Sequence, residues 1–180
     1  MHETPDITRK NQSLDSVSWN ILGQVYTPKQ MSDDSFSWHA VFPEESFVPP
    51  HVHPHQDEYI YVLEGRIDLI LDGKTTFASA GDLVRMPRGI PHAFFNNSGA
   101  AAHALFWAAP AGKLVELSRR IHNMSSPAEV VKVAREYDVV FLPPVSAAAP
   151  VPLLRKGWSR ALSCACEAKS TTLASMRPRA

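Results

Sequence analysis

Short apolar runs separated by turn residues follow one another between residues 20 and 107. The runs are Asn20–Tyr26, Phe36–Phe42, Tyr59–Leu63, Ile67–Leu71, Leu83–Met86, His92–Phe95 and His103–Trp107. Thr27-Pro28 breaks the first run from the second, and Asp72-Gly73 is a strong hairpin signal because both residues tolerate a positive φ. Many short strands with regular turns predict an all-β sandwich or barrel.

The periodicity changes after Pro110. Leu114, Leu117 and Ile121 recur at helical spacing, which predicts a first helix. A second helix is predicted by Ser126 as N-cap, Pro127 at the first helical position and Glu129 as the reciprocal cap. The buried stripe of this helix is expected to be Val130, Val133, Ala134 and Tyr137. We expect both helices to pack outside the barrel or to close its mouth.

These patterns divide the chain into four parts. Residues 1–18 are a polar arm, 19–110 the β-barrel, 111–141 a C-terminal helical segment and 142–180 a tail rich in Pro and Ala. The tail lacks lasting apolar periodicity, so it is expected either to be poorly ordered or to wrap a partner subunit. Both alternatives stay open.

Composition and charge narrow the class of protein. A chain of 180 residues with 44% hydrophobic and 20% charged residues can bury one substantial core. Lys plus Arg balances Asp plus Glu at 18 each, and no basic stripe is present, so neither nucleic acid nor an anionic membrane is an expected partner.

The N-terminus and the cysteines point to a reducing compartment. The first residues are polar with no apolar run behind them, and no stretch is long enough to span a bilayer, so we expect a cytoplasmic protein. Cys164 and Cys166 form neither a disulfide framework nor a convincing zinc site, and we interpret them as reduced bystander thiols.

Candidate chemistry concentrates in two segments. In an extended strand His51 and His53 project from one face, which makes them a chelating pair. Glu58 has the wrong parity for the same strand and Pro54 cannot donate to a ladder, so the chain is expected to turn between residues 54 and 57. The next strand can then direct Glu58 back at the pair.

A further imidazole follows a tight bend. Pro87, Gly89 and Pro91 mark this bend, and His92 is expected to open another strand. An HxH pair alone is more often a surface or core feature than a metal site. Three imidazoles and a carboxylate on converging strand ends, however, predict a site for one divalent cation.

The spacing of these residues resembles a known pair of motifs. HxH-x4-E-x6-G runs from His51 to Gly65, and G-x5-P-x-G-x2-H-x3-N runs from Gly81 to Asn96. Both are similar to the two motifs of the cupin superfamily, over residues 20–110. The first departs from the family pattern at Glu45, where a glycine is usual.

This resemblance implies a cupin jelly roll, a double-stranded β-helix barrel with C-terminal α-helices. By the same resemblance His51, His53, Glu58 and His92 are the metal ligands, Gly65 and Gly81 lie at turns, and Asn96 is structural. His53-Pro54-His55 is also an HxH triplet, so a register that uses His55, or a supporting role for His55 behind a ligand, stays open.

The expected cofactor is one divalent transition metal. Three imidazoles and a carboxylate suit Fe, Mn, Ni, Co, Cu or Zn, and the sequence does not choose among them.

The substrate pocket is predicted from strand alternation. If Glu58 and His92 face inward, so do Ile60, Val62 and Phe94, with Phe106 or Trp107 joining from the last strand. Core packing is the simpler interpretation of any one of these side chains. Together with a metal they indicate a pocket for a small, largely hydrophobic molecule that carries a metal-binding oxygen.

Within the superfamily the chain looks most like the small single-domain quercetin-dioxygenase-like cupins. That resemblance implies a metal-dependent dioxygenase, an oxidoreductase, acting with dioxygen on a small enolisable or flavonol-like aromatic substrate, with Glu58 as the proton acceptor. A homodimer is the expected assembly. Two alternatives stay open: a non-oxidative isomerase, cyclase, decarboxylase or lyase that uses the same metal, and a cupin that binds a small molecule without turnover.

Overall fold

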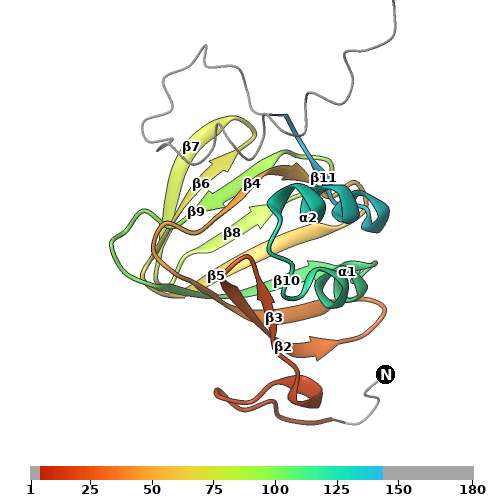
Figure 1. Ribbon diagram of the computed structural model, residues 1–180. Coiled ribbons are helices and arrows are strands. Elements are labelled where there is room, and N and C mark those ends of the chain that lie inside the picture. The colour runs from red at the N-terminus through yellow and green to blue at the C-terminus, as the bar shows by residue number, and fades with distance from the viewer. Residues whose placement is uncertain (1–4, 144–180) are drawn as a thin grey trace, which may run out of the picture. The chain divides into compact units, whose positions relative to one another are not determined.

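Two antiparallel β-sheets face each other and enclose the core (Figure 1). The six-stranded sheet contains, in spatial order, β1 (Trp19–Ile21), β2 (Gln24–Met31), β3 (Phe36–Phe42), β10 (Ala102–Ala109), β5 (Asp57–Glu64) and β8 (Leu83–Met86). The five-stranded sheet contains β11 (Val140–Phe141), β4 (Phe47–Val52), β9 (His92–Phe95), β6 (Arg66–Leu71) and β7 (Lys74–Ser79). The all-β jelly-roll prediction is thereby confirmed.

The computed structural model describes residues 5–143. Within the N-terminal arm, residues 14–16 form a short 3-10 helix, and Lys29 Nζ donates to the carbonyls of Arg9 and Lys10 at 3.0 Å, which fixes the arm to β2. The predicted tail from residue 144 onward, with Cys164 and Cys166, lies outside the described residues.

The first predicted strand is in fact a hairpin. Leu22 and Gly23 have positive φ values of 51° and 91°, so the chain reverses there and separates β1 from β2. The predicted break at Thr27-Pro28 does not occur, because β2 continues to Met31. Pro28 lies at a register shift against β3, where a residue without an N–H is tolerated.

Strand alternation builds the core as predicted. Along β3 and β10 every second residue is buried. The ring of Trp38 stacks between Phe36 and Phe106, at centroid distances of 4.7 and 5.4 Å. Each fully buried aromatic side chain of this kind contributes about 1.5–3 kcal/mol to stability.

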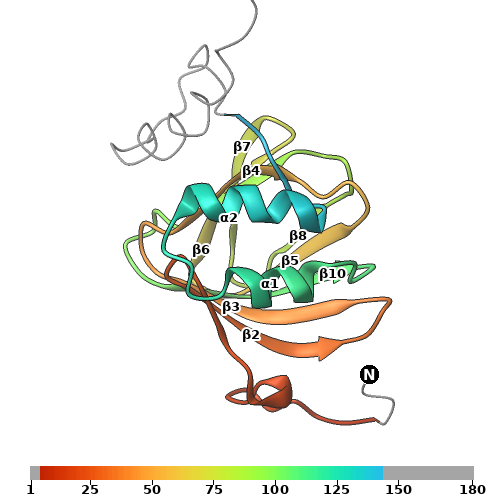
Figure 2. The same cartoon turned by 45° about the vertical axis from the view of Figure 1, so that its right-hand side comes forward.

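Two short helices follow the barrel. The first, α1 (Leu114–Ile121), buries Leu114, Leu117 and Ile121. The second, α2 (Pro127–Ala134), begins with Ser126 Oγ accepting from the Glu129 N–H at 3.3 Å, as the capping prediction requires. A 3-10 turn at residues 135–137 then leads into β11. Figures 1 and 2 show α1 and α2 on the same side of the barrel.

The motif turns have the backbone conformations that the resemblance implied. Gly65 and Gly81 have φ values of 79° and 95°. Glu45, at the position where a glycine is usual, has a φ of 64°. A side chain is therefore accommodated in the left-handed region, and the turn is retained without its glycine.

Asn96 joins two segments of backbone. Its side chain is fully buried, and its amide donates to the carbonyls of Phe42 at 2.8 Å, Pro43 at 3.2 Å and Ala100 at 2.7 Å. The amide thereby connects the end of β3 to the turn before β10. This contact set matches the structural role expected from the sequence.

Replacing Asn96 with alanine is expected to lower the free energy of unfolding by about 3 kcal/mol, because buried carbonyls lose their donor. Asn97→Ala is the matched control, since the neighbouring Asn97 is exposed and makes one contact of 3.3 Å to Asp68. We expect the control to change stability by less than about 0.5 kcal/mol. Urea unfolding of both variants measures the difference; equal effects would show that Asn96 has no special role.

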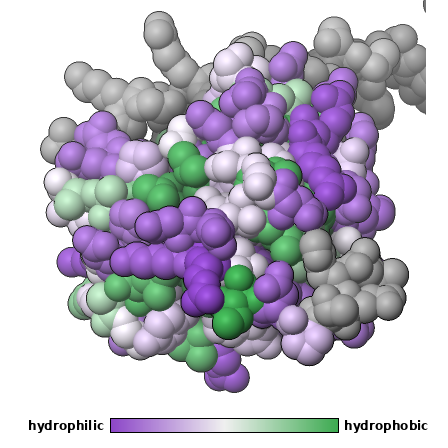
Figure 3. Space-filling model, turned by 90° about the horizontal axis from the view of Figure 1, so that it is seen from below, coloured by the Kyte–Doolittle hydropathy of each residue, from purple (hydrophilic) through white to green (hydrophobic). Residues whose placement is uncertain are grey.

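The surface is mixed in character. On the face drawn in Figure 3, hydrophilic residues predominate and hydrophobic residues occur between them in small groups. Among residues 5–143, no helix has the length and hydropathy that a membrane crossing requires.

Candidate metal centre

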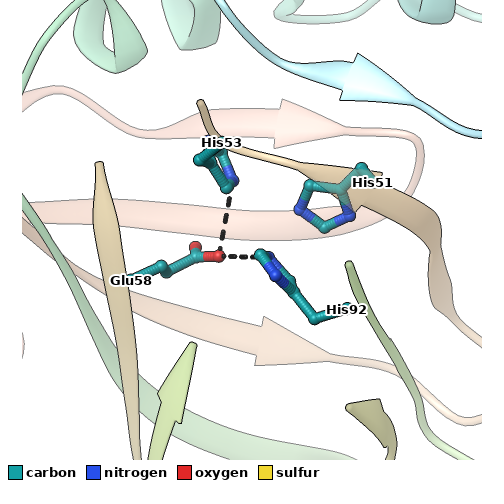
Figure 4. A group of neighbouring side chains, drawn as sticks. All are labelled: His51, His53, Glu58 and His92. Carbon is teal, nitrogen blue, oxygen red and sulfur yellow. Dashed lines mark hydrogen bonds and ion pairs between the residues drawn. The ribbon is translucent and has the colours of Figure 1, made fainter. Parts of the chain in front are cut away.

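Three strands bring four polar side chains together between the two sheets. His51 lies near the end of β4 and His53 just beyond it, Glu58 lies in β5, and His92 opens β9. The Cα atoms of His51 and His92 are direct partners in the β4–β9 ladder. Figure 4 shows the four side chains pointing toward one another. The turn expected between residues 54 and 57 separates β4 from β5 and directs Glu58 back at the histidines.

The cluster is compact and buried. None of its members is more than 4% exposed. One potential ligand atom from each residue lies within 4.8 Å of all the others. Four polar groups this close in a buried position require strong compensation, which a bound cation would supply.

Backbone carbonyls orient two of the imidazoles. His51 Nδ1 lies 2.8 Å from the Pro49 oxygen and His92 Nδ1 lies 3.0 Å from the Ile90 oxygen. A carbonyl oxygen can only accept, so each Nδ1 carries a proton and donates it. In the neutral ring Nε2 is then left as a lone pair, which is the form that binds a metal.

The contacts of Glu58 also favour a cation shared by the carboxylate and the imidazoles. Its Oε2 lies 3.1 Å from His92 Nε2 and 3.5 Å from His53 Nε2. A carboxylate oxygen and an imidazole lone pair at 3.1 Å repel each other unless a proton or a metal cation lies between them. His53 Nδ1 is buried without a hydrogen-bond partner among the described residues.

Electrostatics favour the ligand forms of Glu58 and His51. Burial raises the pKa of Glu58, but hydrogen bonds and charge interactions with His53 and His92, when these rings carry the bridging proton, outweigh it and hold this pKa well below its usual range. A bound cation would take the place of that proton. Burial, followed by the charges of His92 and His53, lowers the pKa of His51 well below its ordinary value. The carboxylate is therefore ionised and His51 is neutral at neutral pH. The donor set fits a divalent transition metal.

His55 lies apart from this group. It is exposed and is not a member of the buried cluster. The alternative register that pairs His53 with His55 is therefore not the one that the fold assembles, because Pro54 and the turn direct His55 to the solvent.

A cavity of about 110 Å³ opens beside the cluster, and His51, His53 and Glu58 form part of its wall. The two helices cover it. They contribute Leu114, Leu117, Ser118, Ile121, Val130 and Ala134 to the lining. The expectation that the helices close the mouth of the barrel thus describes their position, and they also supply part of the cavity wall.

The residues predicted to bind substrate lie in different places. Phe94 lines the cavity. Ile60, Val62 and Phe106 face inward but are packed in the core, at most 1% exposed and outside the cavity lining. Trp107 alternates with Phe106 and points to the outer face, where its ring stacks on Tyr59 at 5.0 Å.

Sequence reasoning missed three polar side chains of the cavity wall, Gln24 and Tyr26 in β2 and Ser118 in α1. For the two in β2, the Leu22-Gly23 dipeptide was the available signal. A turn placed there would have begun a new strand at Gln24 and put Gln24 and Tyr26 on one face.

Comparison with known proteins agrees with this geometry. Residues 38–108 match the cupin domain, and the match contains all four cluster residues. The barrel of this chain therefore contains a cupin domain. KdgF from a Halomonas species has a similar fold, with a TM-score of 0.52 at 18% identity, covering 59% of this chain and 94% of KdgF.

Two curated cupin relatives share shorter segments. The chain is 33% identical over 63 residues to "Polyketide synthase CurC" of Streptomyces cyaneus, covering 35% of this chain and 41% of the relative. It is 41% identical over 46 residues to "Quercetin 2,3-dioxygenase" of Bacillus subtilis (strain 168), covering 26% of this chain and 14% of the relative. The cupin therefore spans less than half the length of either relative.

Proposed function

We propose that this cupin is a metal-dependent dioxygenase acting on a small, largely apolar, enolisable molecule. The observation that carries the proposal is the buried group of three imidazoles and one carboxylate at the wall of an apolar cavity. A ligand with one acidic oxygen fits this combination, because its oxygen reaches the cluster while its carbon skeleton fills the cavity.

The three histidines and Glu58 would have different roles. His51, His53 and His92 would hold the metal through Nε2, with the Nδ1 of His51 and of His92 fixed by backbone carbonyls. A bound divalent metal acts as a Lewis acid that favours the deprotonated form of the substrate oxygen. Glu58 would accept the proton that the enol releases, since its carboxylate is ionised and lies among the ligands.

The size of the cavity narrows the substrate class. A cavity of about 150 Å³ accommodates benzene in an engineered protein, and the volume here is about 110 Å³. Because the cavity is smaller than the one that accommodates benzene, we favour a short 1,3-dicarbonyl compound, or a single ring that is only partly enclosed, over a flavonol. For such a dicarbonyl, dioxygen serves as the oxidant: one C–C bond breaks, both oxygen atoms enter the products, and a carboxylic acid and a 1,2-dicarbonyl result. No external reductant is needed.

The relatives support this class. A polyketide carries repeated carbonyl groups, and quercetin carries an enolic oxygen on an aromatic system, so both names point to enolisable compounds. The second name also contains the dioxygenase reaction. The name of the polyketide synthase relative contains no dioxygenase reaction. The second candidate is therefore a non-oxidative reaction that changes a carbon–carbon bond or transfers a proton.

Oxygen uptake distinguishes the candidates. Protein loaded in turn with Fe²⁺, Mn²⁺, Ni²⁺ or Co²⁺ is expected to consume dioxygen with 2,4-pentanedione, and to form the acid and the 1,2-dicarbonyl in equal amounts. His55→Ala is the control and should retain activity, because His55 is exposed.

Two other results of this experiment would favour the alternative functions. Product that forms equally fast under nitrogen would contradict the dioxygenase and support the non-oxidative enzyme. Ligand that binds and is recovered unchanged would support a binding protein without turnover.

A further inference from the structure

The cavity has a second polar region, formed by Gln24 and Tyr26 of β2. Apart from these two residues, the cluster, Ser118 and the indole N–H of Trp38, the lining is apolar. The Ser118 hydroxyl donates to the Leu114 carbonyl at 2.8 Å and keeps acceptor capacity on the α1 side of the cavity, and Trp38 Nε1–H is a buried donor without a partner among the described residues. Gln24 and Tyr26 are the polar pair on the β2 side of the cavity.

A chain of hydrogen bonds fixes the direction of this pair. Gln24 Nε2 donates to the Phe47 carbonyl at 2.9 Å, which leaves Gln24 Oε1 facing Tyr26. The Tyr26 hydroxyl donates to this Oε1 at 3.0 Å. A hydroxyl has one proton and two lone pairs, so Tyr26 Oη has only acceptor capacity left for the cavity.

The acceptor is neutral. Burial, and secondarily the charge of Glu58, raise the pKa of the Tyr26 hydroxyl far above its ordinary value. The phenol therefore stays protonated and keeps its bond to Gln24 throughout the physiological range. Gln24 is 3% exposed and Tyr26 is partly buried.

We infer that Tyr26 Oη accepts a hydrogen bond from a second polar group of the substrate, a hydroxyl separate from the oxygen that meets the cluster. This assignment rests on the proposed function for the first oxygen. The role of Tyr26 defines the substrate class more closely, as a small ring with a metal-binding oxygen on one side and a hydrogen-bond donor on another. A ligand with only an acceptor at that place would face the lone pairs of Tyr26.

Binding to zinc-loaded protein tests the inference without turnover, because Zn²⁺ has no redox chemistry. The probes are 2-hydroxyacetophenone, its 4-hydroxy and 5-hydroxy derivatives, and the 4-methoxy and 5-methoxy analogues. All share one chelating end and differ in the distal group. We expect one hydroxy derivative to bind about three- to tenfold more tightly than its methoxy analogue, the ratio that one net neutral hydrogen bond provides.

Tyr26→Phe removes the acceptor and keeps the ring, so this ratio should fall to about one. Tyr59→Phe is the matched control and should retain it, because Tyr59 stacks on Trp107 at the outer face. Calorimetry gives the affinities, and metal analysis shows that the zinc content of both variants equals that of the parent protein.

The outcomes separate the two proposals. An unchanged hydroxy-to-methoxy ratio in Tyr26→Phe, or a ratio of one in the parent protein, would overturn the role of Tyr26. If none of the probes binds the zinc-loaded protein more tightly than the metal-free protein, the metal-dependent function itself fails, whatever the ratio.

Discussion

Replacing His92 with alanine is expected to lower metal affinity by more than about 100-fold and to abolish turnover. Loss of an outer partner of a ligand already lowers metal affinity by about 10- to 100-fold, and loss of a ligand removes more. His92 is 2% exposed, and its Nε2 lies 3.1 Å from Glu58. The variant therefore loses a donor that no solvent-facing group replaces. Elemental analysis after dialysis, together with oxygen uptake, measures both effects.

Thermal unfolding supplies the control for this variant. A chelator should lower the Tm of the parent protein, because a metal that binds only the folded state stabilises it by about 2.7 kcal/mol at 100 times its Kd. The same chelator should leave the Tm of His92→Ala unchanged, while His55→Ala should respond like the parent. Full metal occupancy in His92→Ala would contradict the ligand assignment.

Replacing Glu58 with glutamine is expected to reduce kcat by about 100- to 10,000-fold, the range typical of a lost general base. Metal occupancy should fall much less, because the carboxamide keeps an oxygen donor but cannot accept the substrate proton. Glutamine has nearly the same shape as glutamate, so the contact between residue 58 and His92 can be kept. Steady-state oxygen uptake with metal analysis of the same sample gives both quantities.

Glu64→Gln is the control for Glu58→Gln. Glu64 belongs to the same strand, β5, but is exposed, so its loss should leave kcat and metal content within about twofold of the parent. If Glu58→Gln loses as much metal as His92→Ala does, the case for Glu58 as a base disappears, and its role is that of a ligand alone.

Local signals, together with the resemblance to the cupin motifs that implied His92 as the fourth member, allowed the cluster to be predicted from the sequence. The alternation that pairs His51 with His53 is a property of any extended strand. The turn that redirects Glu58 follows from Pro54, and the Asp72-Gly73 hairpin follows from two residues that tolerate the observed φ values of 48° and 75°. Each of these inferences depends on a few neighbouring residues, so no knowledge of the tertiary structure was required.

The cavity wall depends on distant contacts and was predicted poorly. Ile60, Val62 and Phe106 do face inward, but the interior of the barrel extends beyond the cavity, and these three fill the packed part. Which inward residues border empty space depends on where α1 and α2 pack, and no strand pattern contains that information. The placement of Trp107 required the register of β10, which the contacts with β3 and β5 define.

The cavity wall that α1 and α2 supply lies outside residues 38–108, the segment shared with the cupin domain. The four-residue cluster and the helical part of the cavity wall are consequently encoded in separable stretches of the polypeptide. Mutations confined to the two helices can therefore reshape that part of the wall while the histidines and the glutamate stay constant.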